Sequence, residues 1–123
     1  MRVLIDVDGV VADFVGPMLE LAGEVACQQF ERSQVTQWSI RDSLDLSDAQ
    51  WQYVLANLCH PGFAYELRPL PGAVEAVERI ASLHEVYFVT APLGGSATWT
   101  ADRDAWLSRH FGQDLGGRVV HTS

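Results

Sequence analysis

The chain has 123 residues, of which 48% are hydrophobic, and this is enough to bury the core of one globular domain. Its formal net charge is −8, and its acidic residues are dispersed. This argues against a nucleic-acid polymer or an anionic membrane as partner, since both bind clustered Lys and Arg. All eight basic residues are Arg, so the 123 residues contain no lysine that could serve a site.

The cysteines and the apolar stretches indicate in which cellular compartment the protein works. Cys27 and Cys59 lack the spacing of a metal site or a disulfide framework, and they fit buried thiols in a reducing environment. The sequence shows no signal-peptide pattern and no apolar run near the ~20 residues that span a bilayer. We therefore predict a cytoplasmic protein without membrane contact.

The first predicted element is a strand over residues 2–7, whose apolar run is typical of a strand covered on both faces of a parallel sheet. Two aspartates, Asp6 and Asp8, lie where this strand ends, and Gly9 lets the backbone turn there. Two crowded carboxylates suit a hard cation such as Mg²⁺, or a division into nucleophile and general acid. The alternative is an ordinary strand end, in which Asp-Gly only makes a turn.

The middle of the chain predicts helices. Apolar residues recur at helical spacing from residue 14 to about 32, and a capping box of Ser47 and Gln50 begins a second helix. The interval from residue 14 to residue 70 is too long for a single crossover connection between two parallel strands. It predicts a small helical insertion over residues 14–70 between core segments 1–13 and 71–123, with a plain packed helical layer as the alternative.

The last third alternates between helix and strand. Helices are predicted near 71–83 and 99–111, and strands near 85–90 and 118–122. With the first strand, this predicts an α/β fold with a Rossmann-like parallel sheet. Ligands bind beyond the carboxyl ends of such strands, so Thr90 and Ala91 should meet the aspartates at one edge and donate hydrogen bonds to phosphate oxygens. The alternative is that the Thr90 hydroxyl only caps local backbone.

Three stretches carry a family resemblance: Asp6–Phe14, Phe63–Val77 and Val86–Leu93. They resemble haloacid-dehalogenase-like phosphatases in the form typical of 5′(3′)-deoxyribonucleotidases. The resemblance implies a Mg²⁺-dependent hydrolase that cleaves deoxyribonucleoside 5′(3′)-monophosphates through an aspartyl-phosphate. It also implies that the helical insertion over residues 14–70 is a cap that closes over this small-molecule substrate.

The resemblance assigns roles to the residues of the site. Asp6 would attack phosphorus, and Asp8 would protonate the leaving alkoxide and then deprotonate water. Mg²⁺ would be held by the Asp6 carboxylate, the Asp8 backbone carbonyl and an acidic residue from later in the chain. Thr90 and Ala91 would bind phosphate, although the family usually has Ser at the position of Ala91. Phe14 would line the nucleoside pocket, with a place in the core of the first cap helix as the alternative.

Other residues near these motifs are expected to be structural. Asp13 should cap the helix that follows by accepting from N–H groups of its first turn, rather than take part in catalysis. Trp38, Trp51 and Tyr65 are expected in the core of the cap, with a place in the wall of the nucleoside pocket as the alternative.

The family pattern continues beyond Ser123, with a phosphate-binding lysine after the third strand and a fourth strand that carries a second acidic motif. We therefore expect this chain to be truncated before both features, to bind Mg²⁺ weakly and to have impaired turnover. The first strand should keep an open edge, which favours self-association or recovery of a strand from a second chain. A catalytically inactive nucleotide- or phosphate-binding module and a general small-molecule phosphatase are the alternative functions.

Overall fold

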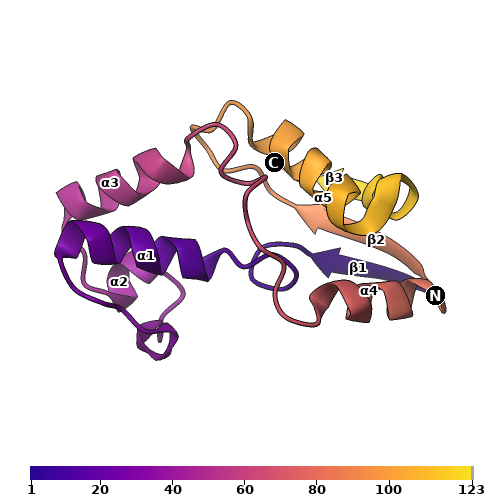
Figure 1. Ribbon diagram of the computed structural model, residues 1–123, viewed down its shortest axis with the longest axis horizontal. Coiled ribbons are helices and arrows are strands. Elements are labelled where there is room, and N and C mark those ends of the chain that lie inside the picture. The colour runs from indigo at the N-terminus through magenta and orange to yellow at the C-terminus, as the bar shows by residue number, and fades with distance from the viewer. Residues whose placement is uncertain (123) are drawn as a thin grey trace.

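The computed structural model describes residues 1–122 and contains three strands and six helical segments in that range. In chain order they are β1 (Arg2–Asp6), α1 (Val15–Ala26), the 3-10 helix η1 (Arg32–Gln34), α2 (Ile40–Ser43), α3 (Asp48–Leu58), α4 (Ala73–Ala81), β2 (Glu85–Thr90), α5 (Trp99–Gly116) and β3 (Val119–His121). Figure 1 shows two regions side by side. The sheet region comprises the strands with α4 and α5, and the helical region comprises α1, η1, α2 and α3.

The three strands form one parallel sheet in the order β1-β2-β3. Ile5 of β1 is opposite Phe88 of β2, and Phe88 is opposite Val119 of β3. This arrangement confirms the predicted α/β class with a small parallel sheet. Within residues 1–122, β1 pairs with β2 alone, so its second edge carries no strand. Self-association through that edge stays a prediction.

Helices cover one face of the sheet. Ile5, Val86 and Phe88 are buried and share a hydrophobic cluster with α4 and α5, two helices that contact each other. Leu4, on the opposite face of β1, is 65% exposed. The prediction of a first strand covered on both faces is therefore wrong for the described residues, because both crossover helices pack on the side of Ile5.

The helical region has its own hydrophobic cluster, in which α1 packs against α3. The α3 helix begins at the predicted capping box: the Ser47 hydroxyl accepts from the Gln50 N–H at 3.2 Å, and the Gln50 side chain accepts from the Ser47 N–H at 2.9 Å. Asp13 Oδ1 accepts from the Gly16 N–H at 3.0 Å in the first turn of α1, which confirms its capping role. Cys27, which follows α1, is exposed rather than buried.

Two adjacent segments of chain join the regions. The Asp13 N–H donates to the Arg68 carbonyl at 2.8 Å, and the Leu70 N–H donates to the Val11 carbonyl at 2.7 Å. The outgoing and returning segments therefore run side by side as an antiparallel pair. Phe14 packs against the hydrophobic clusters of both regions, so the junction is bonded and packed.

Candidate active site

A tight loop follows β1 and positions the two aspartates. The Val7 carbonyl accepts from the N–H groups of Val11 at 2.8 Å and Ala12 at 2.9 Å, which folds the chain back at the strand end. Gly9 has a φ of 79°, a left-handed conformation that glycine adopts without strain. Asp6 is exposed at the end of β1, and its Oδ1 accepts from the Val7 N–H at 2.9 Å. The turn predicted from Asp-Gly is present, with Asp8 inside the loop that it forms.

The end of β2 lies at the same edge of the sheet. Asp6 is opposite Val89, so Thr90 follows at the carboxyl end beside the β1 loop. Thr90 is 2% exposed, and its hydroxyl has no hydrogen-bond partner among the described residues. Ala91 is the exposed first residue of the following loop. The structure thus brings Asp6, Asp8 and Thr90 to the carboxyl end of the sheet, as the topology of a parallel sheet requires.

Arg103 of α5 also contacts this site, and the sequence reasoning missed it. Its Nη2 donates to Asp8 Oδ1 at 2.6 Å, and its side chain is fully buried. The guanidinium lies 5.4 Å from the ring centroid of Trp99 and 5.6 Å from that of Trp106. These positions are i, i+4 and i+7 on one helix face. A charge between two tryptophans on an apolar face was the signal that could have identified Arg103.

The environment of Asp8 changes its acidity. Burial raises the pKa of the Asp8 carboxyl above its ordinary value, while the charge and hydrogen bond of Arg103 oppose the rise and the negative charge of Asp6 adds to it. The net pKa is raised. A carboxyl that holds its proton more readily than usual suits proton transfer to and from a ligand.

A cleft of about 560 Å³ extends from Asp8 into the helical region. Phe14, Trp38 and Trp51 contribute aromatic side chains to its lining. The Phe14 ring meets the Trp99 ring edge-on, with centroids 6.0 Å apart, so it is supported from the sheet region. The cleft therefore joins a carboxyl group to an aromatic wall.

The aromatic residues assigned to the cap core have three different positions. Trp51 is half-buried and packs against the helical cluster while it lines the cleft. Tyr65 instead packs against the cluster of the sheet region, with Arg109 over its ring. Trp38 is fully exposed, so its assignment to the core is wrong. It lies in the non-helical segment before α2, and α2 has only four residues with which to bury it.

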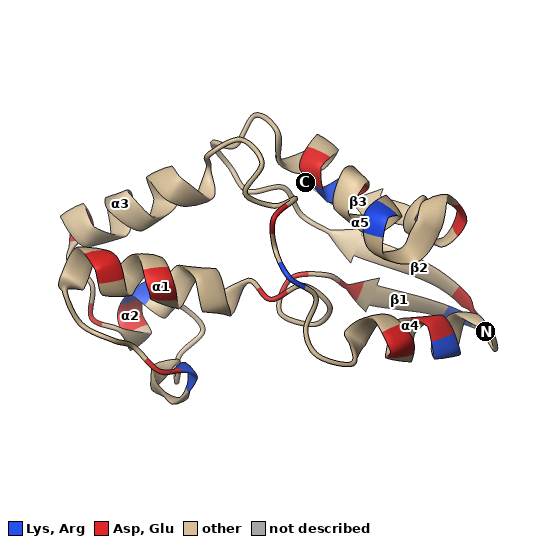
Figure 2. Cartoon of the chain, viewed as in Figure 1, with Lys and Arg blue, Asp and Glu red and all other residues tan. Residues whose placement is uncertain are grey.

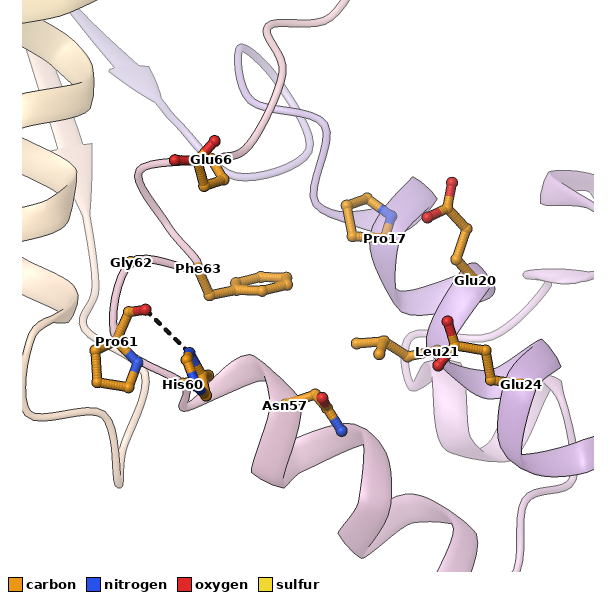
Figure 3. A pocket seen from close by; sticks show the side chains of 10 residues that line it. All are labelled: Pro17, Glu20, Leu21, Glu24, Asn57, His60, Pro61, Gly62, Phe63 and Glu66. Carbon is orange, nitrogen blue, oxygen red and sulfur yellow. Dashed lines mark hydrogen bonds between the residues drawn. The ribbon is translucent and has the colours of Figure 1, made fainter.

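A second cleft of about 530 Å³ lies between α1 and the chain that leaves α3. Figure 3 shows Glu20 and Glu24 on α1, with Glu66 on the other side. Three carboxylates repel a phosphate ester, whereas the lining of the cleft at Asp8 contains a single carboxylate. The cleft at Asp8 is therefore the better site for a phosphorylated ligand.

The charged residues of the part that the structure describes are dispersed. Figure 2 shows acidic residues on α1 and α4, with basic residues scattered among the elements rather than gathered on one face. This pattern is unlike the basic surface of nucleic-acid-binding proteins. None of the helices over residues 1–122 has the length and apolarity needed to cross a membrane.

Oxygen ligands for a divalent cation are present in part. No group of three or more His, Cys, Asp or Glu in the described residues is arranged to hold a metal. Mg²⁺, however, commonly binds through one or two carboxylates, with water and substrate phosphates completing its coordination. The exposed Asp6 carboxylate, beside the Asp8 loop, fits that kind of partial site.

Comparison with known proteins places the chain in a family. It is 32% identical over 127 residues to the mitochondrial 5′(3′)-deoxyribonucleotidase of Homo sapiens, covering 99% of this chain and 56% of that protein. The mitochondrial enzyme of Mus musculus is 33% identical over 134 residues, covering 99% and 58%. A putative 5′(3′)-deoxyribonucleotidase of Bordetella pertussis (strain Tohama I) is 30% identical, covering 99% and 66%.

The chain thus spans little more than half the length of the two mammalian relatives. Its residues 1–119 match the sequence family described as 5′ nucleotidase, deoxy (Pyrimidine), cytosolic type C protein. This match covers most of the chain and includes the β1 loop, the cleft lining and α5. The chain therefore belongs to the deoxy (pyrimidine), cytosolic type C family of 5′ nucleotidases.

Proposed function

We propose that this chain forms the nucleophile-bearing part of a phosphatase that hydrolyses deoxyribonucleoside 5′(3′)-monophosphates. The observation that carries the proposal is the position of Asp6 and Asp8 at the carboxyl end of β1, with Asp8 at one end of a cleft lined by Phe14, Trp38 and Trp51. The family membership supports the substrate class. Residues 14–70 then serve as the cap, and residues 1–13 with 71–123 as the core.

The proposed reaction has two steps. An Asp6 carboxylate oxygen attacks phosphorus, and the bond from phosphorus to the nucleoside oxygen breaks as Asp8 gives that oxygen a proton. Water then attacks phosphorus and passes a proton to Asp8. The bond to Asp6 breaks, and inorganic phosphate leaves. The raised pKa of Asp8 supports its alternation between acid and base.

Phosphate and metal would be held beside Asp6. The buried Thr90 hydroxyl lacks a partner among the described residues, so it is available to donate to a phosphate oxygen, with the Ala91 backbone N–H beside it. The Asp6 carboxylate and the Asp8 backbone carbonyl would hold Mg²⁺. When bound, the cation neutralises charge on the phosphoryl group.

The aromatic wall formed by Phe14, Trp38 and Trp51 supports a nucleoside as the ligand. A base that stacks on Phe14, Trp38 or Trp51 gains contact area with little demand on base identity. The cleft offers this surface within the same cavity as Asp8, so the sugar-phosphate end would lie toward the loop that follows β1. A general phosphatase would gain nothing from the aromatic wall.

The test is phosphate release from a pyrimidine deoxyribonucleoside monophosphate with Mg²⁺ present. Asp6→Asn should lose at least about 10³-fold in kcat because it removes the nucleophile. Asp114→Asn, which removes an exposed carboxylate of α5, is the matched control and should retain wild-type turnover.

Wild-type release no greater than that of Asp6→Asn would overturn the proposed activity. Nucleotide binding by calorimetry in that case would identify a binding module without turnover. Equal kcat/KM for nucleotides and for simple alkyl phosphates would identify a general phosphatase instead.

A further inference from the structure

Arg103 is a buried cation with most of its hydrogen-bonding capacity unused. Its Nη2 donates to Asp8, but Nε and Nη1 are buried and have no partner among residues 1–122. A buried charge with unsatisfied donors is costly, and an apolar side chain of similar volume would fill this space without that cost. Packing alone therefore gives no reason for an arginine at this position.

The surroundings of Arg103 exclude direct contact with a ligand. Its side chain is fully buried, with the rings of Trp99 and Trp106 close to the guanidinium. Its hydrogen bond goes to Asp8, whose side chain is 28% exposed. The hydrogen bond to Asp8 is therefore the contact through which Arg103 can act on a ligand in the cleft.

The helix that carries Arg103 is fixed by the residues on either side of it. Asp102 accepts from the Gly62 N–H at 2.9 Å, which ties α5 to the chain that returns from the helical region. Asp104 Oδ1 lies 2.6 Å from His121 Nε2, which ties α5 to β3. Three consecutive side chains thus connect α5 to three separate segments, and Arg103 is held on a rigid support.

We propose that Arg103 is a positioning residue that holds Asp8 Oδ1 and so leaves Asp8 Oδ2 as the oxygen presented to the leaving group and to water. This assignment rests on the proposed phosphatase function. A carboxyl group can rotate between its two oxygens, and an acid catalyst must direct one of them at the reacting atom. The bond from Arg103 removes that rotation.

The test separates the leaving-group step from binding. In single turnovers, Arg103→Met should slow release of the nucleoside from a deoxyribonucleoside monophosphate about 10- to 100-fold. In steady state, KM should stay within about threefold of that of the wild type. Release of nitrophenol from p-nitrophenyl phosphate should fall less than about threefold, because this leaving group departs without a proton. A merely structural role would lower both rates equally.

Two further variants identify the route of the effect. In an Asp8→Asn background, Arg103→Met should cause no additional loss, because the residue that it positions is gone. Arg103→Lys keeps a cation near Asp8 and should recover part of the nucleoside rate. Arg109→Met is the matched control: Arg109 lies on the same helix, over the Tyr65 ring at 5.3 Å, and its loss should leave both rates unchanged.

Each outcome decides the assignment. Equal losses on both substrates, or an undiminished loss in the Asp8→Asn background, would overturn it. Should Arg103→Met fail to fold by circular dichroism, Arg103→Lys decides alone: it must slow nucleoside release more than nitrophenol release. Wild-type turnover no greater than that of Asp6→Asn would instead overturn the proposed function, which is a separate result.

Discussion

The sheet region and the helical region are packed with different kinds of side chain. The buried cluster of the sheet region includes aromatic residues such as Phe88 and Trp106, and the buried Arg103 lies over the Trp106 ring. The buried cluster of the helical region is aliphatic, with aromatic residues only partly buried around it. The sheet region can therefore hold a charge in a fixed place, while the helical region presents aromatic surface at its margin.

We expect the two regions to serve different purposes at the cleft beside Asp8: the sheet region for the reaction and the helical region for ligand binding. The groups that we propose for proton transfer and phosphate binding lie at the carboxyl ends of β1 and β2, and most of the aromatic wall comes from the helical region. Substitutions in the core of the sheet region should affect stability strongly. Substitutions at the margin of the helical region should affect ligand binding and leave stability almost unchanged.

The largest expected effect is that of Trp106→Ala. Trp106 is fully buried, and its Nε1 donates to the Leu67 carbonyl at 2.7 Å, so the change leaves a cavity and an unpaired carbonyl. We expect a loss of about 3–5 kcal/mol in the free energy of unfolding. Guanidinium titration followed by circular dichroism measures it. A loss below about 1 kcal/mol would mean that the core of the sheet region is not a rigid support for Arg103.

A smaller effect, on binding alone, is expected for Trp38→Ala. Trp38 is fully exposed, so the free energy of unfolding should change by less than about 0.5 kcal/mol. Loss of one stacking surface should raise KM for a deoxyribonucleoside monophosphate about tenfold. KM for a simple alkyl phosphate, which has no ring to stack, should stay nearly constant.

Leu83→Ala is the matched control for Trp38, since Leu83 is also an exposed hydrophobic residue and does not line the cleft. Neither KM nor stability should change in it. An unchanged nucleotide KM in Trp38→Ala would remove Trp38 from the aromatic wall.

The smallest effect concerns the junction of the two regions. Burial alone would raise the pKa of Asp13, but bonds from Arg32 and from the Gly16 N–H outweigh it and lower the pKa below its ordinary value. A lowered pKa contributes stability above the unfolded-state pKa, and this contribution is lost as the pH falls through the folded-state pKa. Asp13→Asn should therefore cost less than about 1 kcal/mol at neutral pH, because the ion pair is partly exposed.

Urea unfolding of wild type and Asp13→Asn at neutral and strongly acidic pH measures the difference. The two proteins should become equally stable at low pH, where the carboxyl of Asp13 is protonated in both states. A difference that persists there would assign the effect to capping of α1 rather than to the pair with Arg32.

Local patterns were sufficient to predict much of this molecule. Apolar runs and helical spacing gave the positions of the three strands and the longer helices, and the capping box at Ser47 and Gln50 marked the start of α3. The meeting of Asp6, Asp8 and Thr90 followed from topology, since parallel strands end at one edge of a sheet. Each of these features depends on neighbouring residues or on the direction of the chain.

Tertiary packing alone decided the rest. Arg103 and Asp8 are 95 positions apart, and their contact depends on how α5 lies on the sheet. The exposure of Trp38 depends on what surrounds a short helix, and the exposed face of β1 depends on which side both crossover helices occupy. The helical spacing of Arg103 with its two tryptophans places it on one face of α5, but it does not identify Asp8 as the partner. Contacts of this kind form between side chains that the chain brings together only after its elements have packed.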